Sequence, residues 1–166
     1  IGVWVESTAL GGDFVNQEGG GIYVSNSVVL HSSAISDGDT KAKSKSKVED
    51  VDIAAGGIVL IGDTLSGSVG NHGVIDVSTN VEMHADATAT AAGNAKAHEI
   101  GARNVDHEAA GIWLDVDVLT GGLENTGDIL VSSTFDMSAV SSAKGGGSEV
   151  EADSRADNLY SESYGI

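Results

Sequence analysis

Apolar and polar residues alternate strictly over long stretches of this chain. In one such stretch the first parity reads Ile75, Val77, Thr79, Val81, Met83, Ala85, Ala87, Ala89 and Ala91, and every residue between them is polar. A period of two is typical of a β-strand with one packed face and one wet face. The alanine-rich part would also suit a helix, but β-branched Val and Thr within alternating polarity favour a strand. We therefore predict an all-β chain.

The alternation runs too far for an ordinary strand. From Ile22 to Val48 the same parity stays apolar or small, and such a stretch would span roughly 90 Å at about 3.3 Å per residue. The chain must therefore bend while the same face stays inside, as a β-solenoid does by turning corners and stacking parallel strands. The Asn-X-Gly phrases at Asn71 and Asn125 suit corners, because Asn and Gly tolerate left-handed backbone angles.

The whole pattern recurs along the chain. A Gly-apolar pair begins at Gly2, Gly57, Gly111 and Gly165, at spacings of 55, 54 and 54 residues. Further matched steps are Leu10, Leu65 and Leu119; Gly12, Gly67 and Gly121; Phe14, Val69 and Leu123; and Asn16, Asn71 and Asn125. The first unit carries two extra residues within 18–21. A fixed period of this size indicates stacked units, each burying its apolar face only against its neighbours.

These observations predict one domain over residues 1–166, a parallel β-solenoid (β-helix) of three imperfect repeats of about 54 residues. The units are 2–56, 57–110 and 111–164, and a fourth begins at 165. The number of coils in each unit stays open. Rungs of the usual size would give two or three coils per unit, whereas the aligned Asn and His positions favour one large flattened coil.

The composition argues against several classes of function. The net charge is −17, from 25 acidic and 8 basic residues, and the chain has no Pro and no Cys. Because nucleic acids and anionic membranes attract clustered Lys and Arg, we expect neither as a partner. No apolar run approaches the roughly 18 residues of a spanning helix, so we expect no membrane insertion by a helix. The missing Pro leaves every backbone N–H available to the strand ladders.

The repeats resemble a known group of proteins. The runs 109–114 and 119–129, Ala-Ala-Gly-Ile-Trp-Leu and Leu-Thr-Gly-Gly-Leu-Glu-Asn-Thr-Gly-Asp-Ile, look like the repeats of bacterial surface β-solenoids. These include autotransporter-type passengers and haemagglutinin-like adhesins. The resemblance covers all three units and implies an extracellular or cell-surface setting, with no catalytic residue carried over. Since the chain begins at Ile1 with no signal-like segment, we expect a window on a longer or processed polypeptide.

Several side chains are candidates for specific roles. Asn16, Asn71 and Asn125 are read as corner residues that satisfy local backbone groups, with an amide ladder as the alternative if one unit makes one coil. In that case His31 and His84 would also be neighbours and could share a metal; the competing interpretation is isolated exposed histidines. Trp4, Trp113 and Tyr23 are expected on the ends or the outer faces.

Acidic residues form same-face pairs that offer the only route to metal or enzyme chemistry. The pairs are Asp50 with Asp52, Asp115 with Asp117, and Glu149 with Glu151 and Asp153. Calcium takes six to eight converging oxygens, which a flat strand face supplies poorly. We predict no cofactor, with calcium as the possible exception. An enzyme acting on acidic polysaccharide would need a positioned constellation in a pocket, and the sequence offers none, so we predict that the protein is not an enzyme.

A row of lysines is the sharpest local feature. Lys41, Lys43, Lys45 and Lys47 alternate with small residues and share one outer face. Counted back from the next Gly-Ile pair, the first three match Glu149, Glu151 and Asp153 of the third unit. One interpretation is a basic edge that prevents aggregation. The other is head-to-tail stacking, in which the acidic third unit of one molecule meets the basic first unit of the next.

The sequence thus favours a structural protein that is extracellular or on a bacterial cell surface and associates with itself into a fibre, sheath or stalk. The alternative is an adhesin passenger that binds glycans or a host surface.

Overall fold

Every regular element in the described part of the chain is a β-strand. The computed structural model describes residues 1–98 and 103–166. The strands are β1 (Val3–Glu6), β2 (Ala9–Leu10), β3 (Phe14–Asn16), β4 (Gly21–Gly38), β5 (Lys41–Leu65), β6 (Val69–Asn71), β7 (Val74–Ala91), β8 (Asn94–Leu119), β9 (Leu123–Asn125), β10 (Asp128–Lys144) and β11 (Val150–Tyr164). The prediction of an all-β chain is confirmed. The described residues contain no helix long and apolar enough to cross a membrane.

The strands pair in parallel within three sheets. The sheet orders are β1-β5-β8-β11 with β2 beside β5, then β10-β7-β4, and β3-β6-β9. Partners lie about one repeat apart: Asn16 pairs with Asn71, Ile22 with Ile75, and Ile75 with Ile129. The register shortens by two residues between the first two of these pairs, which places the two extra residues of the first unit in the loop after Asn16. Parallel sheets of this kind are consistent with a β-solenoid.

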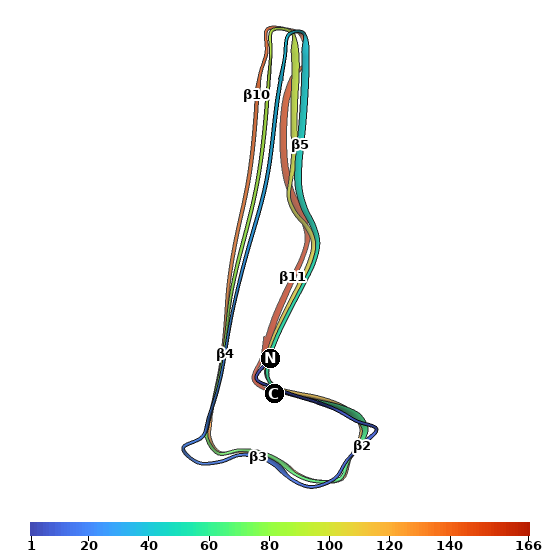
Figure 1. Cartoon of the computed structure of the whole chain (residues 1–166), viewed down its shortest axis with the longest axis vertical. Coiled ribbons are helices and arrows are strands. Elements are labelled where there is room, and N and C mark those ends of the chain that lie inside the picture. The colour runs from blue at the N-terminus through green and yellow to red at the C-terminus, as the bar shows by residue number, and fades with distance from the viewer.

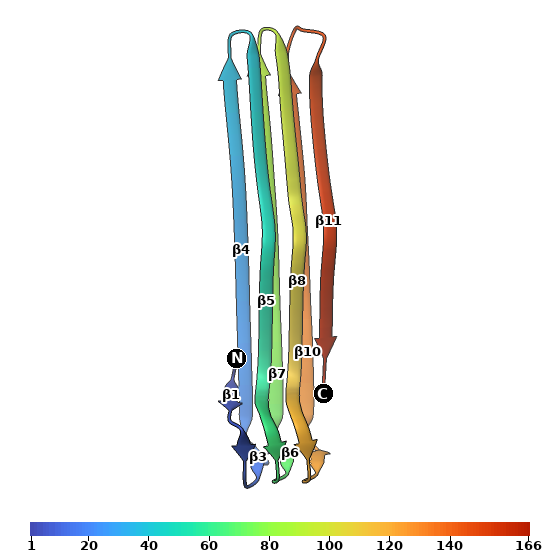
Figure 2. The same ribbon diagram turned by 90° about the vertical axis from the view of Figure 1, so that its right-hand side faces the viewer.

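The molecule has a long narrow arm and a wider end. Seen down the stack, successive passes of the chain overlie one another (Figure 1). One wall of the arm is formed by β4, β7 and β10, and the other by β5, β8 and β11 (Figure 2). The turn at Asp39 and Thr40 joins the walls at the tip and ends the first long strand. We call the residues 2–56, 57–110 and 111–164 the first, middle and third layers.

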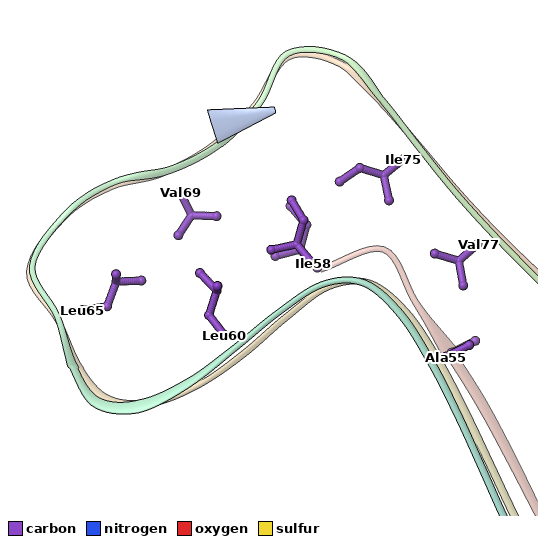
Figure 3. Close-up of a cluster of buried hydrophobic side chains, with 9 residues drawn as sticks. Ala55, Ile58, Leu60, Leu65, Val69, Ile75 and Val77 are labelled. Carbon is purple, nitrogen blue, oxygen red and sulfur yellow. The ribbon is translucent and has the colours of Figure 1, made fainter. Parts of the chain in front are cut away.

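The size of the core side chains decreases from the wide end to the tip. At the wide end Ile58, Leu60, Leu65, Val69 and Ile75 form the largest cluster (Figure 3). Val81, Met83 and Val105 fill the middle of the arm. Near the tip the core consists of Ala42, Ala87, Ala89, Ala91, Ala95 and Ala97. Because alanine fills so little space, the two walls of the arm lie close together there.

The repeated Gly-apolar pairs mark the junction between arm and wide end. A Cβ on Gly57 would lie 2.6 Å from the carbonyl oxygen of Gly111 and would overlap the side chain of Ile75. A Cβ on Gly2 would lie 2.5 Å from Ile22 Cγ2 and 2.8 Å from the Gly57 carbonyl oxygen. Only glycine permits this close approach of layers and walls, which explains why the chain returns to glycine at every repeat.

Candidate functional site: the open faces of the stack

The charged residues at the tip lie above one another in adjacent layers, in what we call columns. Lys43 pairs with Lys96, and Lys96 pairs with Glu151. Lys45 pairs with His98, which pairs with Asp153. Lys41 pairs with Asn94, and the register of the third layer places Glu149 beside the same Asn94. The structure therefore brings the three lysines and three acids of the predicted match into common columns, two layers apart.

The middle layer already forms an acid-on-base contact of the kind predicted for the ends. Lys96 Nζ lies 3.2 Å from Glu151 Oε2 and 3.6 Å from Glu149 Oε2, across one layer. The hydrogen bond to Glu151, followed by the charge of Glu149, raises the pKa of Lys96 above its ordinary value. Such a pair on the surface contributes little to stability, but it shows that the layer spacing suits lysine stacked on glutamate.

The fourth lysine of the row differs from the other three. Lys47 Nζ contacts Glu49 Oε2 within its own strand. Within residues 1–98 and 103–166 no ion pair is formed by Lys41, Lys43 or Lys45, all of which are exposed. The free basic row on the first layer is thus three lysines long.

A fourth charged column lies at the other wall of the tip, and the sequence analysis missed it. Asp37 of the first layer and Lys144 of the third layer both pair with Thr90 of the middle layer. Here the acid is on the first layer and the base on the third, the reverse of the three lysine columns. Once the two extra residues of the first unit are subtracted, Asp37 and Lys144 fall at the same step of their repeats, and this match was the signal that could have revealed the column.

The three corner asparagines form an amide ladder. Asn16, Asn71 and Asn125 end β3, β6 and β9. Asn16 Nδ2 donates to Asn71 Oδ1 at 2.8 Å, and Asn71 Nδ2 donates to Asn125 Oδ1 at 2.8 Å. Each donor amide also bonds a backbone carbonyl of the next layer, that of Val74 or Asp128. The ladder has a direction, because every donor points from the first layer towards the third.

A second ladder stands at a bend halfway along the arm. Asp50, Asn104 and Asn158 have φ angles of 54°, 51° and 53°, in the left-handed region that Asn and Asp tolerate. Asn104 Nδ2 donates to Asp50 Oδ1 at 2.9 Å, and Asn158 Nδ2 donates to Asn104 Oδ1 at 3.0 Å. Its donors point towards the first layer, where Asp50 accepts. Asp50 is thus the terminal acceptor of this ladder.

The other candidate ligands do not gather into a metal site. His31 and His84 are neighbours in register, with ring centroids 6.3 Å apart and edge-on. His31 Nε2 lies 3.1 Å from Asp86 Oδ2, and His84 Nδ1 bonds Ser138 Oγ at 2.6 Å. Asp52 pairs with Asp106 across one layer. No group of three or more His, Asp or Glu side chains that could hold a metal occurs among the described residues.

A buried histidine lies inside the arm, where the sequence analysis did not single it out. His107 is 1% exposed, and its ring nitrogens bond Thr79 Oγ1 at 2.8 Å and Ser161 Oγ at 3.0 Å. Burial lowers the pKa of His107 below its ordinary value, and the charge of Asp106 offsets part of this effect. Its place on the inward parity, between Val105 and Ala109, was the available signal.

A tryptophan-walled groove lies outside the bend between arm and wide end. Trp4, Val59 and Trp113 form one column, and they line a groove of about 210 Å³ together with Ile1, Glu108 and Asp115. Trp4 is 51% exposed. The groove combines two aromatic walls with carboxylates at its margin. Tyr23 is also exposed, on β4.

In comparisons with known proteins, no protein-family model, no curated protein and no solved structure matches the chain.

Proposed function

We propose that this chain is a structural segment of a parallel β-solenoid, with three repeats of about 54 residues, and that copies of it stack end to end into a fibre, sheath or stalk. The role is architectural rather than catalytic. The proposed setting is extracellular or on a bacterial cell surface, which rests on the resemblance of the repeats alone.

One observation carries the proposal: the middle layer is closed and the outer layers are not. Ile75, Val77 and Val81 are 0% exposed. Their partners in the first and third layers, such as Ile22 and Ile129, are only partly buried. The outer layers also present β4 and β10 as long sheet edges. Long unpaired edges are templates for further strands, so another layer of the same kind would complete them.

In a longer polypeptide, a further repeat of the same chain would cover these faces in the same way. The isolated 166-residue chain therefore tests the contact between molecules. Sedimentation over a range of concentrations, followed by negative-stain microscopy, should show reversible association into filaments. A monomer that persists at every concentration would contradict self-association.

The second candidate is a glycan-binding adhesin module, and the tryptophan groove favours it. Exposed Trp side chains with one apolar and one polar part are frequent at recognition surfaces. A glycan array should then give a defined hit that is lost in the variants W4A and W113A. Binding that persists in both variants would remove the groove from this role.

A further inference from the structure

We infer that copies of this chain join head to tail in one register, with the third layer of one copy covering the first layer of the next. The inference rests on the proposed self-association and specifies its partner, polarity and alignment. It follows from continuing each column by one layer beyond the molecule.

The charged columns at the tip support this polarity. Adding a first layer on the third layer places Lys41, Lys43 and Lys45 of the added copy on Glu149, Glu151 and Asp153, in the order given by the columns. It also places Asp37 on Lys144. All four contacts pair opposite charges, although the acid and the base change places between the two walls. A joint of two first layers or two third layers would lack these four pairs, because the members of each pair lie on opposite faces of the molecule.

The amide ladder supports the same direction. Asn125 is the last rung, and its Nδ2 is the atom that would donate to the next layer, as Asn16 and Asn71 do within the molecule. On an added copy, Asn16 Oδ1 is the unused acceptor at this step. Every donor then points the same way through the joint. A joint of two first layers or two third layers would lack this bond, because the donor Asn125 and the acceptor Asn16 lie on opposite faces of the molecule.

The tryptophan column fixes the alignment. Trp4 and Trp113 are separated by one intervening residue, Val59, so they do not stack inside the molecule. In the joint, Trp4 of the added copy follows Trp113 directly, about 4.8 Å away along the column. This separation lies within the range of offset aromatic stacking. The joint would thus create a Trp pair that the free molecule lacks.

The chain ends fit this joint with a short overlap. Gly165 already sits over the third layer, since Ile112 N donates to its carbonyl oxygen at 3.0 Å. The residues 164–166 therefore hold the places that residues 1–3 of the added copy would take. One of these two short ends must move out of these places when the joint forms. Trp4 of the added copy is the first residue whose place in its column is not already taken. Four columns oppose the joint: Arg155 would meet Lys47, Asn158 would meet Asp50, Asp157 would meet Glu49, and Asp115 would meet Glu6.

A pair of engineered cysteines tests the alignment, because the chain has none of its own. Ser25 and Ser132 both pair with Ser78, and both are exposed. Inside one molecule they are two strands apart, about 9.6 Å, which is too far for a disulfide. Across the joint they would be adjacent, at about 4.8 Å, within the range a disulfide needs. The double variant S25C/S132C should therefore form disulfide-linked chains of many copies when oxidised.

Three control variants make this result specific. The pair S27C/S132C is displaced by two residues along the strand, about 8 Å in total, and should remain unlinked. The single variants S25C and S132C should also remain unlinked. If wild-type molecules associate but the controls link as efficiently as S25C/S132C, the proposed register is wrong. If wild-type molecules do not associate at all, the proposed function itself fails.

Charge exchange tests the polarity without relying on disulfides. The variant K41E/K43E/K45E should raise the concentration at which assembly begins by at least about tenfold, since it opposes like charges at the joint. The variant E149K/E151K/D153K should do the same. Combining both sets in one chain should restore assembly, which a folding defect would not allow. Assembly that ignores both single sets, or that high salt leaves unchanged, would overturn the charge pairing.

Discussion

Ile75 in the middle layer and Ile22 in the first layer occupy the same step of the repeat, yet only Ile75 is fully buried. The same contrast holds between Val77 and Val24. Nothing in the local sequence distinguishes these positions, because all four side chains are aliphatic and point inward. The difference comes from the number of neighbouring layers, two for the middle layer and one for each outer layer. In this molecule burial is therefore a property of position in the stack.

The largest expected effect comes from truncating the core at both positions. We expect Ile75→Ala to cost about 4 kcal/mol, since it leaves a cavity walled on both sides. Ile22→Ala should cost about 2 kcal/mol, because solvent already reaches this side chain. Urea unfolding at a concentration where the chain is monomeric gives both values. Equal costs would mean that the outer layers are as well closed as the middle layer.

The amide ladder offers the same comparison among polar groups. Asn71→Ala removes two ladder bonds and leaves Asn16 Nδ2 and Asn125 Oδ1 without this partner, so we expect a loss of about 2 kcal/mol. Asn125→Ala removes only the last rung and should cost about 1 kcal/mol. Thermal or urea unfolding of the two variants tests this order. A larger cost at Asn125 would contradict a ladder centred on the middle layer.

Much of this organisation could be predicted from the sequence, and the reasons are physical. The alternation around Ile75 shows which side faces inward, and the spacing of the glycines shows which residues lie over one another. The number of coils per repeat could not be decided, because local alternation is the same for a small coil and a large one. The amide ladder depended on that choice, so the sequence favoured the corner interpretation of Asn71 and left the ladder as the alternative. His107 escaped notice because its direct neighbours, Asp106 and Glu108, are charged, and only its shared parity with Val105 and Ala109 indicates that it faces inward.

The pH dependence of unfolding should sharpen the comparison further, because His107 is a buried titratable group of the middle layer. In the unfolded chain a histidine titrates near pH 6.5, whereas burial lowers the pKa of His107 in the folded chain. The unfolded state therefore takes up a proton first, and stability should fall as the pH drops below about 6.5.

Urea midpoints measured between pH 7.5 and 5.5 check this expectation. The slope of the urea midpoint against pH should decrease in His107→Gln. It should persist in His72→Gln, which alters a half-buried histidine that bonds Thr126. An unchanged slope in His107→Gln would assign the effect to other groups.

The smallest expected effect is a gain. Ser44 Oγ is buried without a hydrogen-bond partner, although the same step in the middle layer is Ala97. Replacing Ser44 with Ala removes an unpaired buried hydroxyl and should stabilise the chain by about 1 kcal/mol. Ser46→Ala is the matched control, because Ser46 Oγ bonds the Ser32 carbonyl at 2.8 Å and its loss should be destabilising. A Ser44→Ala variant less stable than the wild type would refute this account.

Asp50 has a mechanical consequence for any assembled fibre. A carboxylate has no N–H to give, so the ladder that passes through Asn104 and Asn158 stops wherever a new copy starts. The junction between two copies, after every third layer, would thus lack this hydrogen bond, whereas the layers within each copy are joined by it. Under tension or in a mild chaotropic wash, such a fibre would break at these junctions and release whole molecules, leaving the layers within each one intact.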